Sequence, residues 1–152
     1  MGDEMNGITE IVAPVDLEEH TEKVVEYAAS MAKKLSASLT LLHVVELLRP
    51  IGDMVLGPTT VEEYNTKRLT HAKEQIDKIL SGHTGCKGVV LTGEIVDEII
   101  GFAKKQGANL IIIGTHGSKG LEKLLLGSVA ERVVKNAHCP TLVMNPFKHE
   151  NL

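Results

Sequence analysis

The chain has 152 residues and a net charge of −4 at neutral pH, and it carries no basic block. DNA or RNA is therefore an unfavourable partner, because backbone phosphates require concentrated positive charge on the protein. With 43% apolar, 24% charged and 3% aromatic residues, the composition predicts one globular domain over residues 1–152 with an aliphatic core. The apolar runs are too short to cross a bilayer and the acidic start has no signal-peptide core, so we expect a cytoplasmic protein without membrane contact.

Short β-branched segments alternate with longer helical patterns along the chain, which is typical of βαβ units in a parallel sheet. In chain order, strands are predicted over residues 8–15, 38–45, 88–92, 109–114 and 141–145. Apolar stripes at helical spacing predict four helices between them, around residues 24–35, 69–80, 95–103 and 129–137. Residues 46–60 have no such periodicity and contain two prolines and two glycines, which indicates a long loop.

The number of strands and the right-handedness of their connections predict the topology. We expect an α/β fold with a doubly wound, five-stranded parallel sheet in the order 3-2-1-4-5 and helices on both faces. Ligands of such sheets bind beyond the carboxyl ends of the strands, where the strand order reverses. The topology therefore points to two segments, one after Val15 and the other after Ile113.

The segment after the fourth predicted strand has closely spaced glycines. It reads Gly114-Thr115-His116-Gly117, then nine residues, then Gly127-Ser128 at the start of the last predicted helix. Glycines allow positive φ and a close approach of phosphate to the backbone, and a helix start offers free amides. The same glycines also suit tight turns and a helix cap, but their place in the sheet favours phosphate binding. The pattern is neither a dinucleotide fingerprint nor a Walker A loop.

Asp16 follows the first predicted strand and has two possible roles. A carboxylate at the switch point of the sheet commonly accepts hydrogen bonds from a ribose hydroxyl. A carboxylate just before a helix is also a frequent N-cap. The two roles are compatible, and the sequence leaves both open.

The glycine pattern resembles the G-2x-G-9x-G-S/T signature of the universal stress protein family, in its ATP-binding branch. Pro14-Val15-Asp16, Leu41-Leu42-His43-Val44 and Pro140-Thr141-Leu142-Val143-Met144 are also similar to segments of that family. The resemblance implies that Asp16 meets the ribose, that the backbone of Val44 meets the adenine and that Pro14 lines the base pocket. The implied nucleotide-binding residues are Pro14, Val15, Asp16, Val44, Gly114, Thr115, His116, Gly117, Gly127, Ser128 and Val129.

The resemblance also implies the ligand and the assembly. The ligand would be ATP, or else ADP or AMP, with Mg²⁺ or Mn²⁺ bridging its phosphates rather than held in a protein metal site. Members of the family usually dimerise through their last strands, so a homodimer is expected. The chain departs from the family at Glu18, where many members have Ser.

Three functions are compatible with these residues. The leading hypothesis is a stress-response regulator whose nucleotide occupancy changes its dimer surface or its partners. The alternative is a slow ATP hydrolase or phosphotransferase, with His116 as base and Ser128 as phosphate acceptor. A scaffold with an empty pocket would not need the glycine spacing.

Cys86 and Cys139 form no zinc pattern and are interpreted as structural thiols without a disulfide.

Overall fold

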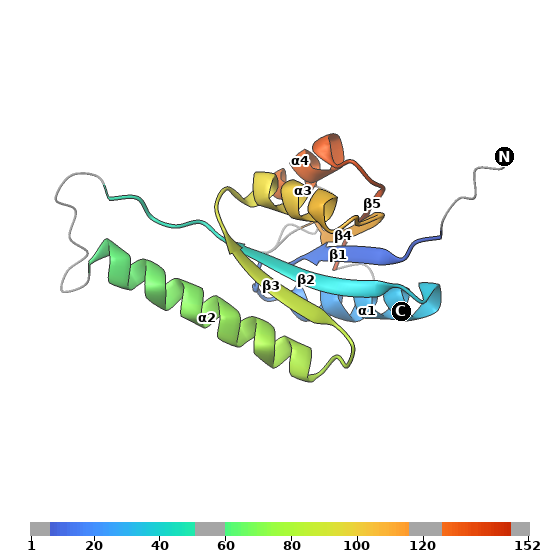
Figure 1. Ribbon diagram of the computed structural model, residues 1–152, viewed down its shortest axis with the longest axis horizontal. Helices are drawn as coiled ribbons and strands as arrows, with labels where there is room; N and C mark the ends of the chain where they lie inside the picture. Colours follow the sequence, from blue (N-terminus) through green and yellow to red (C-terminus); the bar gives the residue numbers. More distant parts are fainter. Residues whose placement is uncertain (1–6, 51–59, 116–125, 147–152) are drawn as a thin grey trace.

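The computed structural model describes residues 7–50, 60–115 and 126–146, which form one parallel sheet with helices on both of its faces (Figure 1). The strands are β1 (Glu10–Pro14), β2 (Ser38–Val45), β3 (Lys87–Thr92), β4 (Leu110–Gly114) and β5 (Thr141–Met144). The helices are α1 (Thr21–Leu35), α2 (Val61–Ser81), α3 (Ile95–Lys105) and α4 (Ser128–Asn136).

The sheet has the order β3-β2-β1-β4-β5, and all four neighbouring pairs are parallel. The predicted α/β fold and strand order are therefore confirmed. Helices α1 and α2 cover one face of the sheet, while α3 and α4 cover the other. Because the strands are parallel, all of their carboxyl ends meet at one edge of the sheet.

The sheet divides the core into two apolar clusters. Ile112 of β4 packs with Ile11 and Leu41 on the α1/α2 side, while its neighbour Ile111 packs with Leu42 on the α3/α4 side. Successive side chains of a strand point to opposite faces, so a strand that is covered on both sides must be apolar throughout. This explains the uninterrupted aliphatic run of β4, in which Ile111 and Ile112 are both 0% exposed.

The start of α2 differs from the prediction. The apolar stripe begins at Leu69, but the helix begins at Val61, where the side chain of Thr60 accepts a hydrogen bond from the Glu63 N–H at 3.2 Å. A threonine in this position is a favourable N-cap. The first turns of α2 extend beyond the carboxyl edge of the sheet (Figure 1), and Val61 is their only buried residue, so they carry no continuous apolar stripe.

One side chain fixes the opposite, amino edge of the sheet. Asn109 lies just before β4, and its Oδ1 accepts hydrogen bonds from the backbone N–H groups of Thr9 and Glu10, both at 3.0 Å. Its Nδ2 donates to the carbonyl of Gly7 at 3.3 Å. These bonds join the beginning of β1 to the beginning of β4.

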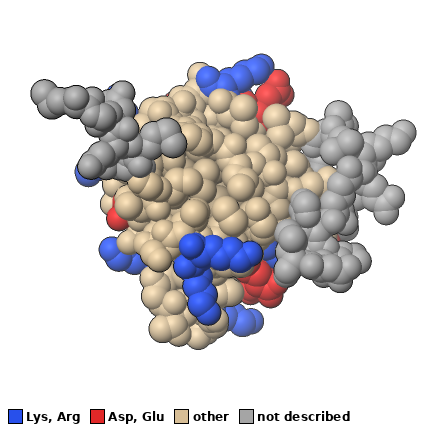
Figure 2. All heavy atoms as spheres, turned by 90° about the vertical axis from the view of Figure 1, so that its right-hand side faces the viewer, with Lys and Arg blue, Asp and Glu red and all other residues tan. Residues whose placement is uncertain are grey.

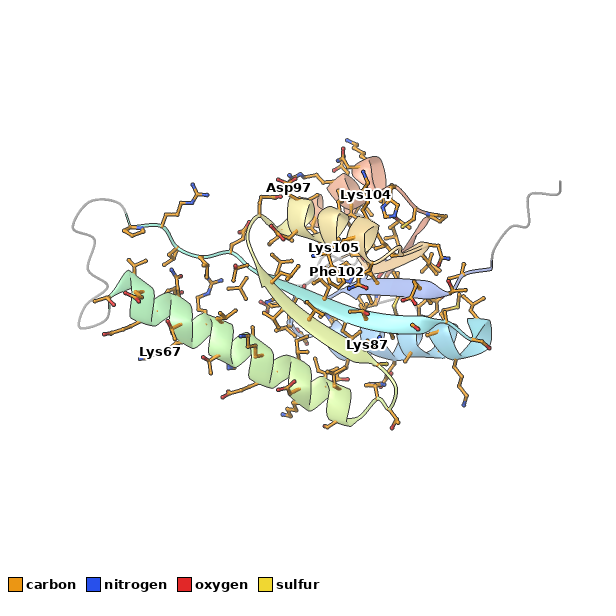
Figure 3. All side chains as sticks on the ribbon, in the orientation of Figure 1. Lys67, Lys87, Asp97, Phe102, Lys104 and Lys105 are labelled. Atoms are coloured by element: carbon orange, nitrogen blue, oxygen red, sulfur yellow. The ribbon has the colours of Figure 1, made fainter. Side chains whose placement is uncertain are left out.

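The charged helix ends are solvated. Lys104 and Lys105 occupy the last turn of α3 and are exposed (Figure 3), as are Lys33 and Lys34 at the end of α1. On the face seen in Figure 2, charged side chains form separate groups around a mostly uncharged centre. In the part of the chain that the structure describes, no helix combines the length and hydrophobicity needed to cross a membrane.

Two glycines in different environments provide a test of the packing of α2 on β3. A Cβ at Gly88 would overlap Cγ2 of Ile76 and lie 2.7 Å from Cδ1 of Leu80. Ile76 is buried and stiff at χ1, so we expect Gly88→Ala to destabilise the fold by about 1–3 kcal/mol. Gly101→Ala in α3 meets no atom within 4 Å and should stabilise it by about 0.5–1 kcal/mol. Urea denaturation measures both, and equal effects would contradict the packing described.

Candidate functional site

A cavity of about 840 Å³ lies at the carboxyl edge of the sheet. It spans the ends of β2, β1 and β4, and it is bounded by the starts of α1 and α4 and by one side of α2. Its position is the topological switch point between β1 and β4, where ligands of doubly wound sheets bind. Nine of the predicted site residues line it, namely Pro14, Val15, Asp16, Val44, Gly114, Thr115, Gly127, Ser128 and Val129.

Two predicted site residues, His116 and Gly117, lie outside the described residues. The suggested catalytic role of His116 and the phosphate role of Gly117 therefore stay predictions. Segments that are more than 100 residues apart in sequence, before Leu17 and after Leu126, nevertheless converge on one cavity.

Asp16 is in the turn between β1 and α1, but it is not the N-cap of the helix. Helix α1 begins at Thr21, so His20 occupies the N-cap position without a side-chain capping bond. The Asp16 Oδ1 accepts hydrogen bonds from the Glu18 N–H at 2.9 Å and from the Thr21 hydroxyl at 3.1 Å. The N-cap interpretation was wrong because the turn is longer than expected, with Leu17 in the left-handed region at φ 63°.

The carboxylate of Asp16 consequently has an oxygen to spare. Both hydrogen bonds that it makes to described residues involve Oδ1, so Oδ2 has no bond among those residues, and Asp16 lines the cavity. A carboxylate whose orientation is fixed by two donors is well placed to accept a hydroxyl hydrogen bond from a ligand. The side chain of Glu18 follows and also lines the cavity.

Backbone and imidazole groups line the cavity beside β2. The N–H of Val15 donates to the Leu42 carbonyl at 2.8 Å, which extends the β1–β2 pairing by one hydrogen bond beyond β1. His43 Nδ1 lies 2.7 Å from the Val15 carbonyl oxygen. Because a carbonyl oxygen only accepts hydrogen bonds, the Nδ1 atom carries the proton. The side chain of Val44 is buried, and its residue lines the cavity.

The β4–α4 side of the cavity offers hydrogen-bond donors. The Gly127 N–H donates to the carbonyl of Thr115, and the Thr115 N–H donates to the carbonyl of Met144, both at 2.9 Å. Gly127 occupies the N-cap position of α4 without a side-chain bond, and Ser128 is the first residue of the helix. The first amides of α4 therefore have no capping side chain, and a helix start with free amides favours anions.

Thr115 has a buried hydroxyl in this wall. Its Oγ1 is inaccessible to solvent and has no hydrogen-bond partner among the residues described. A buried hydroxyl without a partner is costly, and a ligand in the cavity that Thr115 lines would provide one.

Gly114 is required by packing rather than by backbone conformation. It continues β4 in an extended conformation, and its φ is not positive, contrary to the expectation for this turn. A Cβ at this position would lie 2.9 Å from Cγ2 of Val24 in α1. The glycine thus lets α1 approach the end of β4, which brings the start of α1 to the cavity.

Sequence reasoning missed the wall that α2 contributes. Arg68 and His71 line the cavity from this helix. The Arg68 guanidinium lies 5.7 Å from the centre of the Tyr64 ring and donates to the carbonyl of Glu46. The side chain of Asn65 makes two hydrogen bonds to the backbone of Leu48. Its Oδ1 accepts from the Leu48 N–H at 2.9 Å, and its Nδ2 donates to the Leu48 carbonyl at 2.8 Å. Asn65 and Arg68 precede the apolar stripe of α2, and these polar residues were the signal available in the sequence.

The two cysteines lie outside this cavity. Both are free and half buried, and burial raises the pKa of both the Cys86 and the Cys139 thiol. A raised pKa disfavours the thiolate, which is the reactive form. Among the described residues, no cysteine lines the cavity.

Known proteins show the same architecture. The model of the universal stress protein family matches residues 7–145. Universal stress protein MJ0531 of Methanocaldococcus jannaschii is 36% identical over 146 residues, which cover 92% of this chain and 84% of that protein. The solved structure of MJ0577 from the same organism is 27% identical with a TM-score of 0.73, covering 91% of this chain and 96% of that chain.

A structure with a bound nucleotide is also similar. The universal stress protein from Archaeoglobus fulgidus in complex with dAMP is 26% identical with a TM-score of 0.53, covering 89% of this chain and 96% of that chain. The family match extends over nearly the whole described structure, and a relative above 30% identity covers almost all of the chain. This chain therefore belongs to the universal stress protein family.

Proposed function

We propose that this chain binds an adenine nucleotide, with ATP as the leading candidate, and that nucleotide occupancy regulates a homodimer in the stress response. The observation that carries the proposal is the single cavity that joins the Asp16 carboxylate to the uncapped start of α4. One cavity thus offers an acceptor for a ribose hydroxyl and donors for phosphates. A relative of this fold in complex with dAMP supports the adenine nucleotide as ligand.

The arrangement of the walls orients the proposed ligand. The base would lie against Pro14 and the backbone of Val44, and the ribose beside Asp16. The phosphates would then extend toward Thr115 and the start of α4. This direction follows the strand order, because β2, β1 and β4 are consecutive neighbours in the sheet, and neighbouring strands are roughly 4.8 Å apart.

The residues of the cavity also suit a divalent cation held through the nucleotide. Mg²⁺ prefers oxygen ligands and is usually bound by one or two carboxylates together with substrate phosphates. Asp16, Glu18 and the hydroxyl of Ser128 supply such oxygens around the cavity. When bound, the cation would neutralise part of the phosphate charge, and Glu18 would favour its presence.

Two measurements test the nucleotide proposal. Mass spectrometry of the purified protein identifies any nucleotide that is retained, and calorimetric titration of the nucleotide-free protein compares ATP, ADP and AMP with and without Mg²⁺. We expect saturable binding of at least one adenine nucleotide with a stoichiometry of one per chain. Absence of binding of all three in the folded protein would refute the proposal.

The proposed homodimer can be tested at β5, which pairs only with β4 among the described strands. The carbonyls of Pro140 and Met144 face β4, so the intervening N–H of Val143 faces the open edge by the alternation of a parallel ladder. Val143→Pro removes that edge donor without removing a β4–β5 hydrogen bond. We expect sedimentation to show a shift from dimer to monomer. An unchanged assembly would place the interface elsewhere.

A further inference from the structure

The hydrogen-bond ladder between β1 and β2 ends in an unusual way. After the bond from the Val15 N–H to the Leu42 carbonyl, the next rung of a parallel ladder would join the Val44 N–H to the Val15 carbonyl. That rung is not made among the described residues, and the Val15 carbonyl accepts a hydrogen bond from His43 Nδ1 at 2.7 Å. The ladder thus ends one rung early, at the carbonyl that the imidazole of His43 holds.

The early end leaves a donor and an acceptor side by side on Val44. The residues of β2 alternate in direction, and the Val45 carbonyl faces β3, where it accepts from the Gly93 N–H at 3.2 Å. The N–H and C=O of Val44 must then face the side of β1, which turns away at Asp16. Val44 lines the cavity at this place.

A neighbouring N–H and C=O on one backbone residue match adenine and mismatch its close analogues. The Watson–Crick edge of adenine presents the N1 acceptor beside the N6 amino donor. Hypoxanthine, the base of inosine triphosphate, presents an O6 acceptor beside an N1–H donor, which is the reverse order. Backbone groups that pair with adenine therefore leave both partners unpaired with hypoxanthine, and unpaired buried groups are costly.

We infer that His43 is a positioning residue for base specificity. By holding the Val15 carbonyl, its imidazole keeps the N–H and C=O of Val44 free to read the adenine edge. This inference rests on the proposed function, since it concerns the base of the bound nucleotide. It assigns His43 a role that requires no contact between its side chain and the ligand.

The experiment compares two substitutions that differ in one hydrogen-bond donor. His43→Leu removes the donor, whereas His43→Asn places an amide nitrogen the same number of bonds from the backbone as Nδ1. Calorimetry gives the Kd of each protein for ATP and for inosine triphosphate. We expect the wild type and His43→Asn to prefer ATP about tenfold or more, because each lost hydrogen bond costs roughly a factor of three to ten. In His43→Leu the preference should fall below about threefold, chiefly through weaker binding of ATP.

A measurement without ligand separates this inference from the proposed function. In nucleotide-free His43→Leu, the Val15 carbonyl is released and the missing rung can form, so NMR should show slower hydrogen exchange of the Val44 amide than in the wild type. Failure of the wild type to bind any adenine nucleotide would refute the proposed function alone. Wild-type base preference together with unchanged Val44 exchange in His43→Leu would overturn the inference.

A second variant covers the case in which His43→Leu does not fold. His43→Gln keeps a polar amide but moves its nitrogen one bond further from the backbone, away from the position of Nδ1. We expect it to lose base preference as His43→Leu does, and His43→Asn to retain it. Equal preference in these two amide variants would contradict the positioning role.

Discussion

Asp16→Asn is expected to weaken ATP binding about ten- to a hundredfold while the melting temperature barely changes. The asparagine carbonyl oxygen can keep the two bonds that Oδ1 now accepts from Glu18 and Thr21. Its amide group, however, replaces the second carboxylate oxygen with a donor, which would face the ribose of the proposed nucleotide. Hydrogen bonds to charged groups contribute about 1.5–3 kcal/mol, and about 1.4 kcal/mol corresponds to a tenfold change in Kd. Calorimetry and thermal denaturation measure the two effects separately.

Two further variants complete this test. Asp16→Ala also removes the bonds within the turn, so it should weaken binding and cost about 1 kcal/mol of stability. Glu19→Gln removes a nearby negative charge outside the cavity lining and should change neither property. If Asp16→Asn bound ATP as tightly as Glu19→Gln does, the carboxylate would serve only the turn.

Ile112→Ala is expected to lower the free energy of unfolding more than the other substitutions do. Ile112 lies on β4, between β1 and β5 in the sheet, is 0% exposed and packs under α1 with Ile11 and Leu41. Truncating a buried isoleucine to alanine costs about 2–5 kcal/mol, because apolar transfer energy is lost and a cavity remains. A loss of this size is a large part of a typical stability of about 5–15 kcal/mol. Urea denaturation should show it as a lower midpoint with an unchanged slope.

The matched control is a valine on the surface of α4. Val134 is 45% exposed, so Val134→Ala should change the stability by no more than about 0.5 kcal/mol. If Ile112→Ala cost as little as Val134→Ala, the α1/α2 side of the core would be loosely packed.

The architecture was predictable because its signals are local. The aliphatic run of β4 and the apolar stripes of the helices are visible in short windows of sequence, and the handedness of the connections leaves few topologies. The ends of elements were less predictable. Helix α2 begins eight residues before Leu69, since its first turns overhang the sheet and carry no apolar periodicity that would reveal them.

The candidate site was predictable where a residue lies close after the end of a strand: Thr115 directly follows β4, and Asp16 is the second residue after β1. Its finer geometry was not. The two hydrogen bonds of Asp16 depend on Leu17, whose backbone is in the left-handed region. A leucine in the sequence gives no indication of that conformation. At the end of the β1–β2 ladder, the Val15 carbonyl accepts a hydrogen bond from the His43 imidazole rather than from a backbone N–H. This arrangement depends on where β1 and β2 stop pairing. Such details arise from tertiary contacts, which chain order does not reveal.

The bonds of Asn109 have a practical consequence for attaching this protein to surfaces or labels. They hold the beginning of β1 at the amino edge of the sheet, and the five residues of β1 then separate that edge from the cavity by roughly 16 Å. An affinity tag or surface linker joined ahead of Gly7 therefore enters the fold on the side opposite the cavity. Beyond β5 the chain emerges at the cavity edge, where Lys23 of α1 donates to the carbonyl of Pro146. Amino-terminal immobilisation is thus the better geometry for biosensor measurements.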